Sequence, residues 1–300
     1  MALPEVLYTE TYLAFAPAGA SYQERIFPHP DGPHIHMLQS PEAARLAMAN
    51  DILDVLAPAA DDDLVLLSTG NTSQAFYPVF IERAQERGID LTRFRYGHID
   101  NYIYDPAMYP DGSDDEDYKK FLMEHFIKPA GISLENFYPI QGLTADPDKT
   151  AKEYDQWLDE QHIVVAIAGA LGPEPVIHIA FMKPDMDLEV GVAAIDLSDE
   201  VVARNAARAA QDGYPPPPIR AITLGLKHFR HADKIYNLNC GREYVDRVRV
   251  ALTGPIDSNV IGTYLRTQDL GEKVHLYLDA LTAQPIIEYF GLSTFEPTAH

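Results

Sequence analysis

The sequence contains a single cysteine, Cys240, among its 300 residues. One cysteine excludes an internal disulfide framework and a zinc site built from several thiolates. A catalytic thiol would also need an activating base, and the sequence shows none beside it. We therefore expect Cys240 to be a small residue within a strand.

Basic residues are also scarce, because 23 Lys and Arg face 45 Asp and Glu, for a net charge of −22 and a pI near 4.7. Proteins bind nucleic acid backbones through clustered Lys and Arg, so we expect no nucleic acid partner. An anionic ligand would have to be held by a few local cations or by backbone N–H groups. Lys183, Lys227 and Arg242 are the candidate cations.

Long apolar runs are absent. No stretch approaches the roughly 18 consecutive apolar residues that cross a bilayer, and the first 20 residues lack the basic region of a secretion signal. We expect no membrane partner and a cytoplasmic location. Hydrophobic residues (46%) and charged residues (23%) occur at the levels of ordinary globular proteins.

The chain shows no internal repeat, low-complexity tract or flexible linker. The simplest domain organisation is one α/β domain over residues 36–290. An N-terminal extension rich in Pro, Gly and Tyr would precede it over 1–35, and a tail would follow over 291–300.

Apolar runs alternate with amphipathic stretches along this domain. After a helix at 41–57 and a strand, turn and helix within 61–88, strands are predicted at 92–100, 162–170, 176–181, 220–226, 234–240 and 273–279. Helices are predicted at 117–130, 148–161, 198–211 and 241–254. This alternation indicates an α/β fold with a Rossmann-like, mostly parallel sheet and helices on both faces. Ligands bind at the carboxyl ends of the strands in such folds.

A polar turn follows the first buried strand of the domain and consists of Ser68, Thr69, Gly70, Asn71 and Thr72. Its hydroxyls, its amide and the N-terminus of the following helix suit a phosphate or a carboxylate. The same residue types are also common helix N-caps. The residues alone support the two interpretations equally.

Two further stretches carry titratable groups at strand ends. Alternation along a strand puts His98 and Asp100 on one face, where the acid could transfer a proton, although an Asp cap of a turn is the more common use of this spacing. His178 would share a strand face with Val176 and Ala180. A single histidine in an apolar strand is more often a core residue than a catalyst.

The order of these stretches resembles the glucosamine-6-phosphate deaminase and 6-phosphogluconolactonase family. The resemblance spans about residues 35–285 and rests on the polar turn and on four further kinds of segment. Three of these are the motifs HIDNY at 98–102, EPVIHIAFMKP at 174–184 and LNCGREY at 238–244. The fourth kind is the linking stretches 133–142 and 254–268, and the second of these resembles the penultimate helix of the family.

The resemblance implies chemistry on a sugar or sugar phosphate, by ring opening and proton transfer between C1 and C2. Asp100 would move the proton, His178 would open the ring, and the turn at 68–72 would hold the phosphate. Further substrate contacts would come from His98, Asn101, Lys183, Lys227 and Arg242. The family uses neither a cofactor nor a metal ion and commonly forms homo-oligomers, so we expect the same here.

Several positions depart from the family pattern. Val176 and Lys183 replace carboxylates near the histidine, and Asn101 replaces the glutamate after the strand aspartate. Tyr244 replaces a lysine of the phosphate site. These changes remove acids that orient a catalytic imidazole, so the deaminase mechanism is not expected in its usual form.

Three alternatives therefore remain beside a divergent isomerase or deaminase. The first is lactone hydrolysis of the 6-phosphogluconolactonase type, in which the same histidine activates water. The second is a non-catalytic sugar-binding or sensor protein. The third is a metal site formed by His98, Asp100 and His178.

Overall fold

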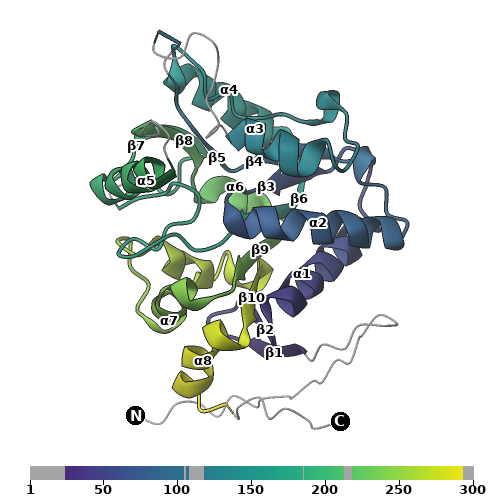
Figure 1. Ribbon diagram of the computed structural model, residues 1–300, viewed down its shortest axis with the longest axis vertical. Coiled ribbons are helices and arrows are strands. Elements are labelled where there is room, and N and C mark those ends of the chain that lie inside the picture. The colour runs from purple at the N-terminus through teal and green to yellow at the C-terminus, as the bar shows by residue number, and fades with distance from the viewer. Residues whose placement is uncertain (1–23, 105, 108–117, 185, 213–217, 293–300) are drawn as a thin grey trace.

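The main sheet of the molecule contains seven strands (Figure 1). This computed structural model describes residues 24–104, 106–107, 118–184, 186–212 and 218–292. The strand order is β1 (Glu24–Pro28), β2 (His34–Leu38), β10 (Val274–Asp279), β9 (Lys234–Asn239), β6 (Ile163–Gly169), β3 (Leu64–Leu67) and β4 (Arg95–His98). All neighbouring strands pair in parallel except β1 with β2. The predicted α/β class and mostly parallel sheet are confirmed.

Helices cover both faces of this sheet. Along β3, Leu64 and Leu66 enter one apolar cluster while Val65 and Leu67 enter the other, as strand alternation requires. The helices are α1 (Pro41–Leu56), α2 (Asn71–Glu86), α3 (Tyr118–Leu122) with a π-turn at Met123–Ile127, α4 (Pro147–Asp159), α5 (Asp199–Asp212), α6 (Leu226–His231), α7 (Val245–Thr253) and α8 (Ala280–Tyr289). Each helix predicted from hydrophobic periodicity is therefore present.

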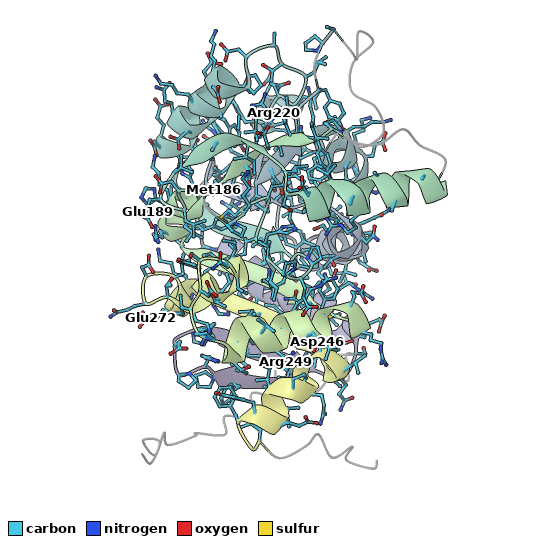
Figure 2. All side chains as sticks on the ribbon, turned by 90° about the vertical axis from the view of Figure 1, so that its left-hand side faces the viewer. Met186, Glu189, Arg220, Asp246, Arg249 and Glu272 are labelled. Carbon is cyan, nitrogen blue, oxygen red and sulfur yellow. The ribbon has the colours of Figure 1, made fainter. Side chains whose placement is uncertain are left out.

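Helix α7 illustrates why these sequences form helices on the sheet. Val248 and Ala251 are buried, whereas Asp246 and Arg249 form an ion pair one turn apart on the outer face (Figure 2). No helix in the described part of the chain combines the length and apolar character that a membrane span needs.

A second, antiparallel sheet of three strands was not expected. It contains β5 (Asp100–Tyr102), β8 (Arg220–Leu224) and β7 (Val192–Asp196). The chain enters it from β4 across Ile99, whose N–H donates to Leu67 O (3.1 Å) in the main sheet and whose carbonyl accepts from Leu224 N (2.9 Å) in the second sheet.

The predicted strand at 176–181 is wrong, because this segment is a loop. Ile177 and Ala180 both have φ near 49°, a left-handed conformation that no strand contains. Donors from residues 261 and 262 hold the loop, since Ile261 N–H donates to Val176 O (2.9 Å) and Gly262 N–H to Ile177 O (2.8 Å). His178 therefore does not share a strand face with its neighbours.

Other expectations also need correction. Residues 24–35, assigned above to a surface extension, supply β1 and the start of β2 in the main sheet, while residues 1–23 lie outside the described residues. The stretch 254–268 contains only a 3₁₀ turn, Ile261–Arg266. Cys240 comes directly after β9, and burial raises the pKa of its thiol to about 12, consistent with an inert side chain.

Candidate active site

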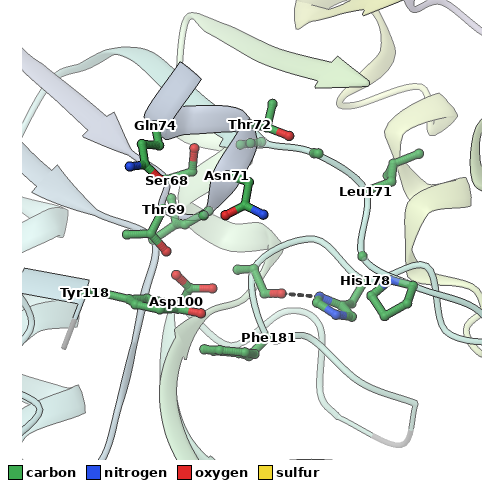
Figure 3. A pocket seen from close by; sticks show the side chains of 18 of the residues that line it. Ser68, Thr69, Asn71, Thr72, Gln74, Asp100, Tyr118, Leu171, His178 and Phe181 are labelled. Carbon is green, nitrogen blue, oxygen red and sulfur yellow. Dashed lines mark hydrogen bonds between the residues drawn. The ribbon is translucent and has the colours of Figure 1, made fainter. Parts of the chain in front are cut away.

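A cavity of about 530 Å³ lies where several strands of the main sheet end (Figure 3). Its walls come from the β3–α2 turn, the start of β5, helix α3, the segment after β6, the loop around residue 178, and helices α5 and α7. Asp100, His178 and the whole turn at 68–72 line it. The structure thus gathers segments that are far apart in the sequence at the sheet edge where a ligand was expected.

The turn at 68–72 leaves the N-terminus of α2 without a side-chain cap. Gly70 occupies the N-cap position with φ of 95°, which favours glycine, and no side chain accepts from the first turn of the helix there. The Ser68 hydroxyl instead bonds Ser73 Oγ at 2.8 Å, and Thr72 Oγ1 lies 3.1 Å from the Tyr244 hydroxyl. The N-cap interpretation is therefore wrong for these side chains, and the geometry suits an anion beside the backbone N–H groups.

Asp100 is buried at the start of β5 and lines the cavity beneath the turn (Figure 3). Burial raises the pKa of its carboxyl to about 7, because removal from water disfavours the charged form. A carboxyl with this pKa can both take and return a proton near neutral pH.

His178 reaches the cavity from the loop. Its Nδ1 lies 2.5 Å from Ala180 O, and because a carbonyl only accepts, Nδ1 carries the proton and Nε2 has a free lone pair. Burial, with a smaller effect of Arg204 and Arg247, lowers the pKa of His178 to about 4, so the ring is neutral at neutral pH. Among the described residues, the buried Nε2 has no hydrogen-bond partner.

Two cavity residues that carry positive charge were not among the predicted site residues. Arg204 of α5 and Arg247 of α7 both line the cavity. The Arg247 guanidinium lies 4.8 Å from the Tyr244 ring centre and donates to Leu171 O at 3.1 Å. Arg247 follows Tyr244 by three residues, and residues at that spacing lie on the same face of a helix. This spacing was the one sequence signal that could have placed Arg247 beside Tyr244.

An aromatic wall was also missed. Tyr118 and Phe181 line the cavity with their rings stacked at 5.8 Å, and Tyr102 lies beside both. Asn205 Nδ2 donates to the Tyr102 hydroxyl at 2.8 Å. Aromatic faces of this kind offer apolar contact to a sugar ring while hydroxyls remain available at the edges.

His98 and Asn101 do not line the cavity. β4 ends at His98, and the change of sheet at Ile99 breaks the alternation that would have put His98 and Asp100 on one face. His98 Nε2 instead accepts from Ile140 N–H at 2.6 Å, and Asn101 Nδ2 donates to Ile140 O at 3.0 Å. Within the described chain, His98, Asp100 and His178 do not form a group with ligand atoms within 4.8 Å of one another.

The three predicted cations also lie outside this cavity. Lys183 and Val176 line a second cavity of about 600 Å³, and both also lie beside His178 in a small void. Lys227 pairs with acids of α4, and Arg242 is exposed in the 3₁₀ turn Arg242–Tyr244.

Known proteins share both sequence and fold with this chain. No protein-family model matches the sequence. The chain is 27% identical over 202 residues to the glucosamine-6-phosphate deaminase of Clostridium beijerinckii, covering 66% of this chain and 78% of that protein. It is 24% identical over 224 residues to the deaminase of Halothermothrix orenii, covering 75% and 87% respectively.

Two solved structures show the same fold. A monomeric glucosamine-6-phosphate deaminase matches with a TM-score of 0.71 at 19% identity, covering 84% of this chain and 99% of that chain. The 6-phosphogluconolactonase of Trypanosoma brucei matches with a TM-score of 0.63 at 15% identity, covering 84% and 98%. Together, the sequence similarity and the shared fold confirm the predicted resemblance of this chain to the glucosamine-6-phosphate deaminase and 6-phosphogluconolactonase family.

Proposed function

We propose that this protein is an enzyme that opens the ring of an amino sugar phosphate or a related sugar phosphate and transfers a proton between C1 and C2. The observation that carries the proposal is that Asp100 and His178 line one cavity together with the uncapped turn at 68–72. The deaminase relatives support the substrate class.

His178 acts first in this scheme. Its unprotonated Nε2 takes the proton of the C1 hydroxyl, and the proton passes to the ring oxygen as the bond between C1 and that oxygen breaks. The pKa of about 4 makes the protonated ring a strong acid, which favours this second transfer. Ala180 O, an acceptor that carries no full charge, takes the orienting role that a carboxylate has beside many catalytic histidines.

Asp100 then removes the C2 proton from the open-chain aldehyde and returns a proton to C1, while O1 gains the proton that the hydroxyl or amino group on C2 loses. The carboxyl must be ionised for the first of these transfers, so the rate should rise with pH through about 7. Arg204, Arg247 and the N-terminus of α2 supply the positive potential for a phosphate in a protein whose overall charge is strongly negative.

Proton exchange in deuterated water tests the proposal. With glucosamine 6-phosphate and a panel of sugar phosphates, NMR should show loss of the C2 proton signal of at least one substrate, faster at pH 8 than at pH 6. Asp100→Asn should slow the exchange by at least about 100-fold. Asp246→Asn, on the outer face of α7, is the matched control and should keep the full rate.

Absence of exchange for every sugar phosphate would contradict the proposal, and so would exchange that survives Asp100→Asn. If the panel raises the melting temperature without turnover, the chain is a sugar-phosphate-binding protein instead.

Lactone hydrolysis is the second candidate, and the free lone pair on His178 Nε2 favours it, because a neutral imidazole can take a proton from water. The fold shared with lactonases is compatible with this activity. Acid release from 6-phosphogluconolactone in a pH-stat, lost in His178→Asn and kept in Asp100→Asn, would select hydrolysis over proton transfer.

A further inference from the structure

A second cluster of titratable side chains lies between α4 and α6, outside the cavity described above. Asp155 and Asp159 lie one turn apart on α4, and His228 and His231 lie three residues apart on α6. One ligand atom from each of Asp159, His228 and His231 lies within 4.8 Å of the others. We propose that these three residues bind a divalent transition metal ion of the zinc type.

The donor set points to this class of metal. Two imidazoles and one carboxylate suit Zn²⁺, Co²⁺, Ni²⁺ or Cu²⁺, whereas Mg²⁺ and Ca²⁺ prefer oxygen ligands throughout. Side chains three residues apart on a helix lie on one face, so both imidazoles can reach one ion. Ligand atoms within 4.8 Å of one another can share one ion, and any adjustment falls on the exposed side chains of Asp159 and His231.

The surroundings of His228 suit a metal ligand. It is fully buried, with its Nε2 2.6 Å from Asp155 Oδ1 and its Nδ1 without a hydrogen-bond partner. A carboxylate on one ring nitrogen is the usual support of a metal-binding histidine.

The backbone makes room for this carboxylate–imidazole pair. A Cβ atom at Gly191 would lie 1.7 Å from Asp155 Oδ1 and 2.9 Å from His228 Nε2. Only glycine at position 191 therefore permits Asp155 and His228 to meet, at the start of β7.

Lys227 competes with the metal ion for the same carboxylate. Its Nζ lies 2.7 Å from Asp159 Oδ1 and 3.4 Å from Asp155 Oδ1. Binding of an ion displaces this ammonium from Asp159 toward solvent, and the long side chain permits that movement. The competition predicts that removing the charge at position 227 strengthens metal binding.

Zinc titration of the full-length, chelator-treated protein tests the site. Calorimetry should show one Zn²⁺ per chain with a rise in melting temperature, and MgCl₂ at the same concentration should give neither. His231→Ala and Asp159→Asn should each weaken zinc binding at least about tenfold, while Lys227→Gln should strengthen it.

The control is His162→Ala, which removes an exposed histidine flanked by Asp63 and Asp233 and should leave the zinc affinity unchanged. Zinc affinity that is the same in His231→Ala as in the unaltered protein, or that falls in Lys227→Gln, would overturn the proposal. None of these variants changes a residue of the sugar cavity, so the result is independent of the proposed enzyme activity.

Discussion

Gly172 and His178 are in close contact at the wall of the cavity. A Cβ atom at position 172 would lie 2.3 Å from the His178 Nε2 and Cδ2 atoms, so the ring lies against the bare Cα of the glycine. Gly172 N–H also donates to His178 O at 2.8 Å. Both contacts fix the position of the imidazole.

Replacing Gly172 with alanine should therefore push the imidazole out of place. We expect Gly172→Ala to lower the proton-exchange rate by at least about tenfold, because a misplaced catalytic group loses the benefit of positioning. Gly88→Ala is the control, since φ of 66° makes alanine unfavourable there but nothing lies within 4 Å of the added methyl. Equal exchange rates in the two variants would show that the imidazole position is unimportant.

The sequence predicted some residues of the site and misplaced others. Asp100, His178 and the turn at 68–72 were predicted and meet at one cavity. The cations were misplaced because the sequence does not show which acid a lysine will pair with, and Lys227 pairs with Asp155 and Asp159. Arg247 was missed because its place depends on the packing of α7.

Among the elements, strands and helices with clear periodicity were predicted well, and the loop at 176–181 was not. Its apolar residues are typical of a strand, and they are buried as in one. The backbone there bonds to residues 261 and 262 instead of to a neighbouring strand, and a local pattern does not contain such tertiary contacts. The second sheet was missed for a similar reason, since strand pairing is not local.

A chain of hydrogen bonds crosses strands β9, β10 and β2. Lys234 Nζ lies 3.4 Å from His275 Nε2, and since ammonium only donates, His275 Nδ1 carries the proton and donates to His36 Nε2 at 3.0 Å. Burial, then the neighbouring His36, His34 and Lys234, lower the pKa of His275 to about 2. This chain of hydrogen bonds therefore requires His275 to be neutral.

This depressed pKa predicts a loss of stability in acid. The unfolded chain takes up the His275 proton near pH 6.5, whereas the folded chain does so only near 2. The free energy of unfolding should therefore fall by about 2–3 kcal/mol through this residue between pH 7 and pH 4.5. Urea unfolding across this range should show a shallower pH dependence in His275→Gln.

His162→Gln is the matched comparison for this measurement. The pKa of His162 is raised, chiefly by its hydrogen bond to Asp63, so this histidine stabilises the folded state in acid. Its loss should steepen the fall in stability, opposite to His275→Gln. Identical pH dependence in all three proteins would contradict the assignment.

On the scale of the whole molecule, the proposed ligand would contact parts that belong to both sheets. The turn at 68–72 follows β3 of the main sheet, Asp100 begins β5 of the second sheet, and Arg204 lies on α5, which packs by Val201 against the second sheet. A bound sugar phosphate should therefore stabilise the two sheets together.

This arrangement predicts a single, ligand-dependent unfolding transition. Glucosamine 6-phosphate at 100 times its Kd should raise the free energy of unfolding by about 2.7 kcal/mol. Denaturation should be followed by circular dichroism and by the fluorescence of Trp157 on α4. Glucosamine without phosphate is the control and should stabilise less. Separate transitions, or a shift seen by one probe alone, would show that the sheets respond independently.

The crossing of the chain between the two sheets at Ile99 limits where a circular permutant of this protein can be opened. The N–H of that residue bonds to one sheet and its carbonyl to the other, and Asp100, the proposed proton-transferring acid, comes next. A circular permutant opened there would put β4 of the main sheet at one free end and Asp100 of the second sheet at the other. Termini relocated to the exposed turn at 256–259 would leave that junction whole.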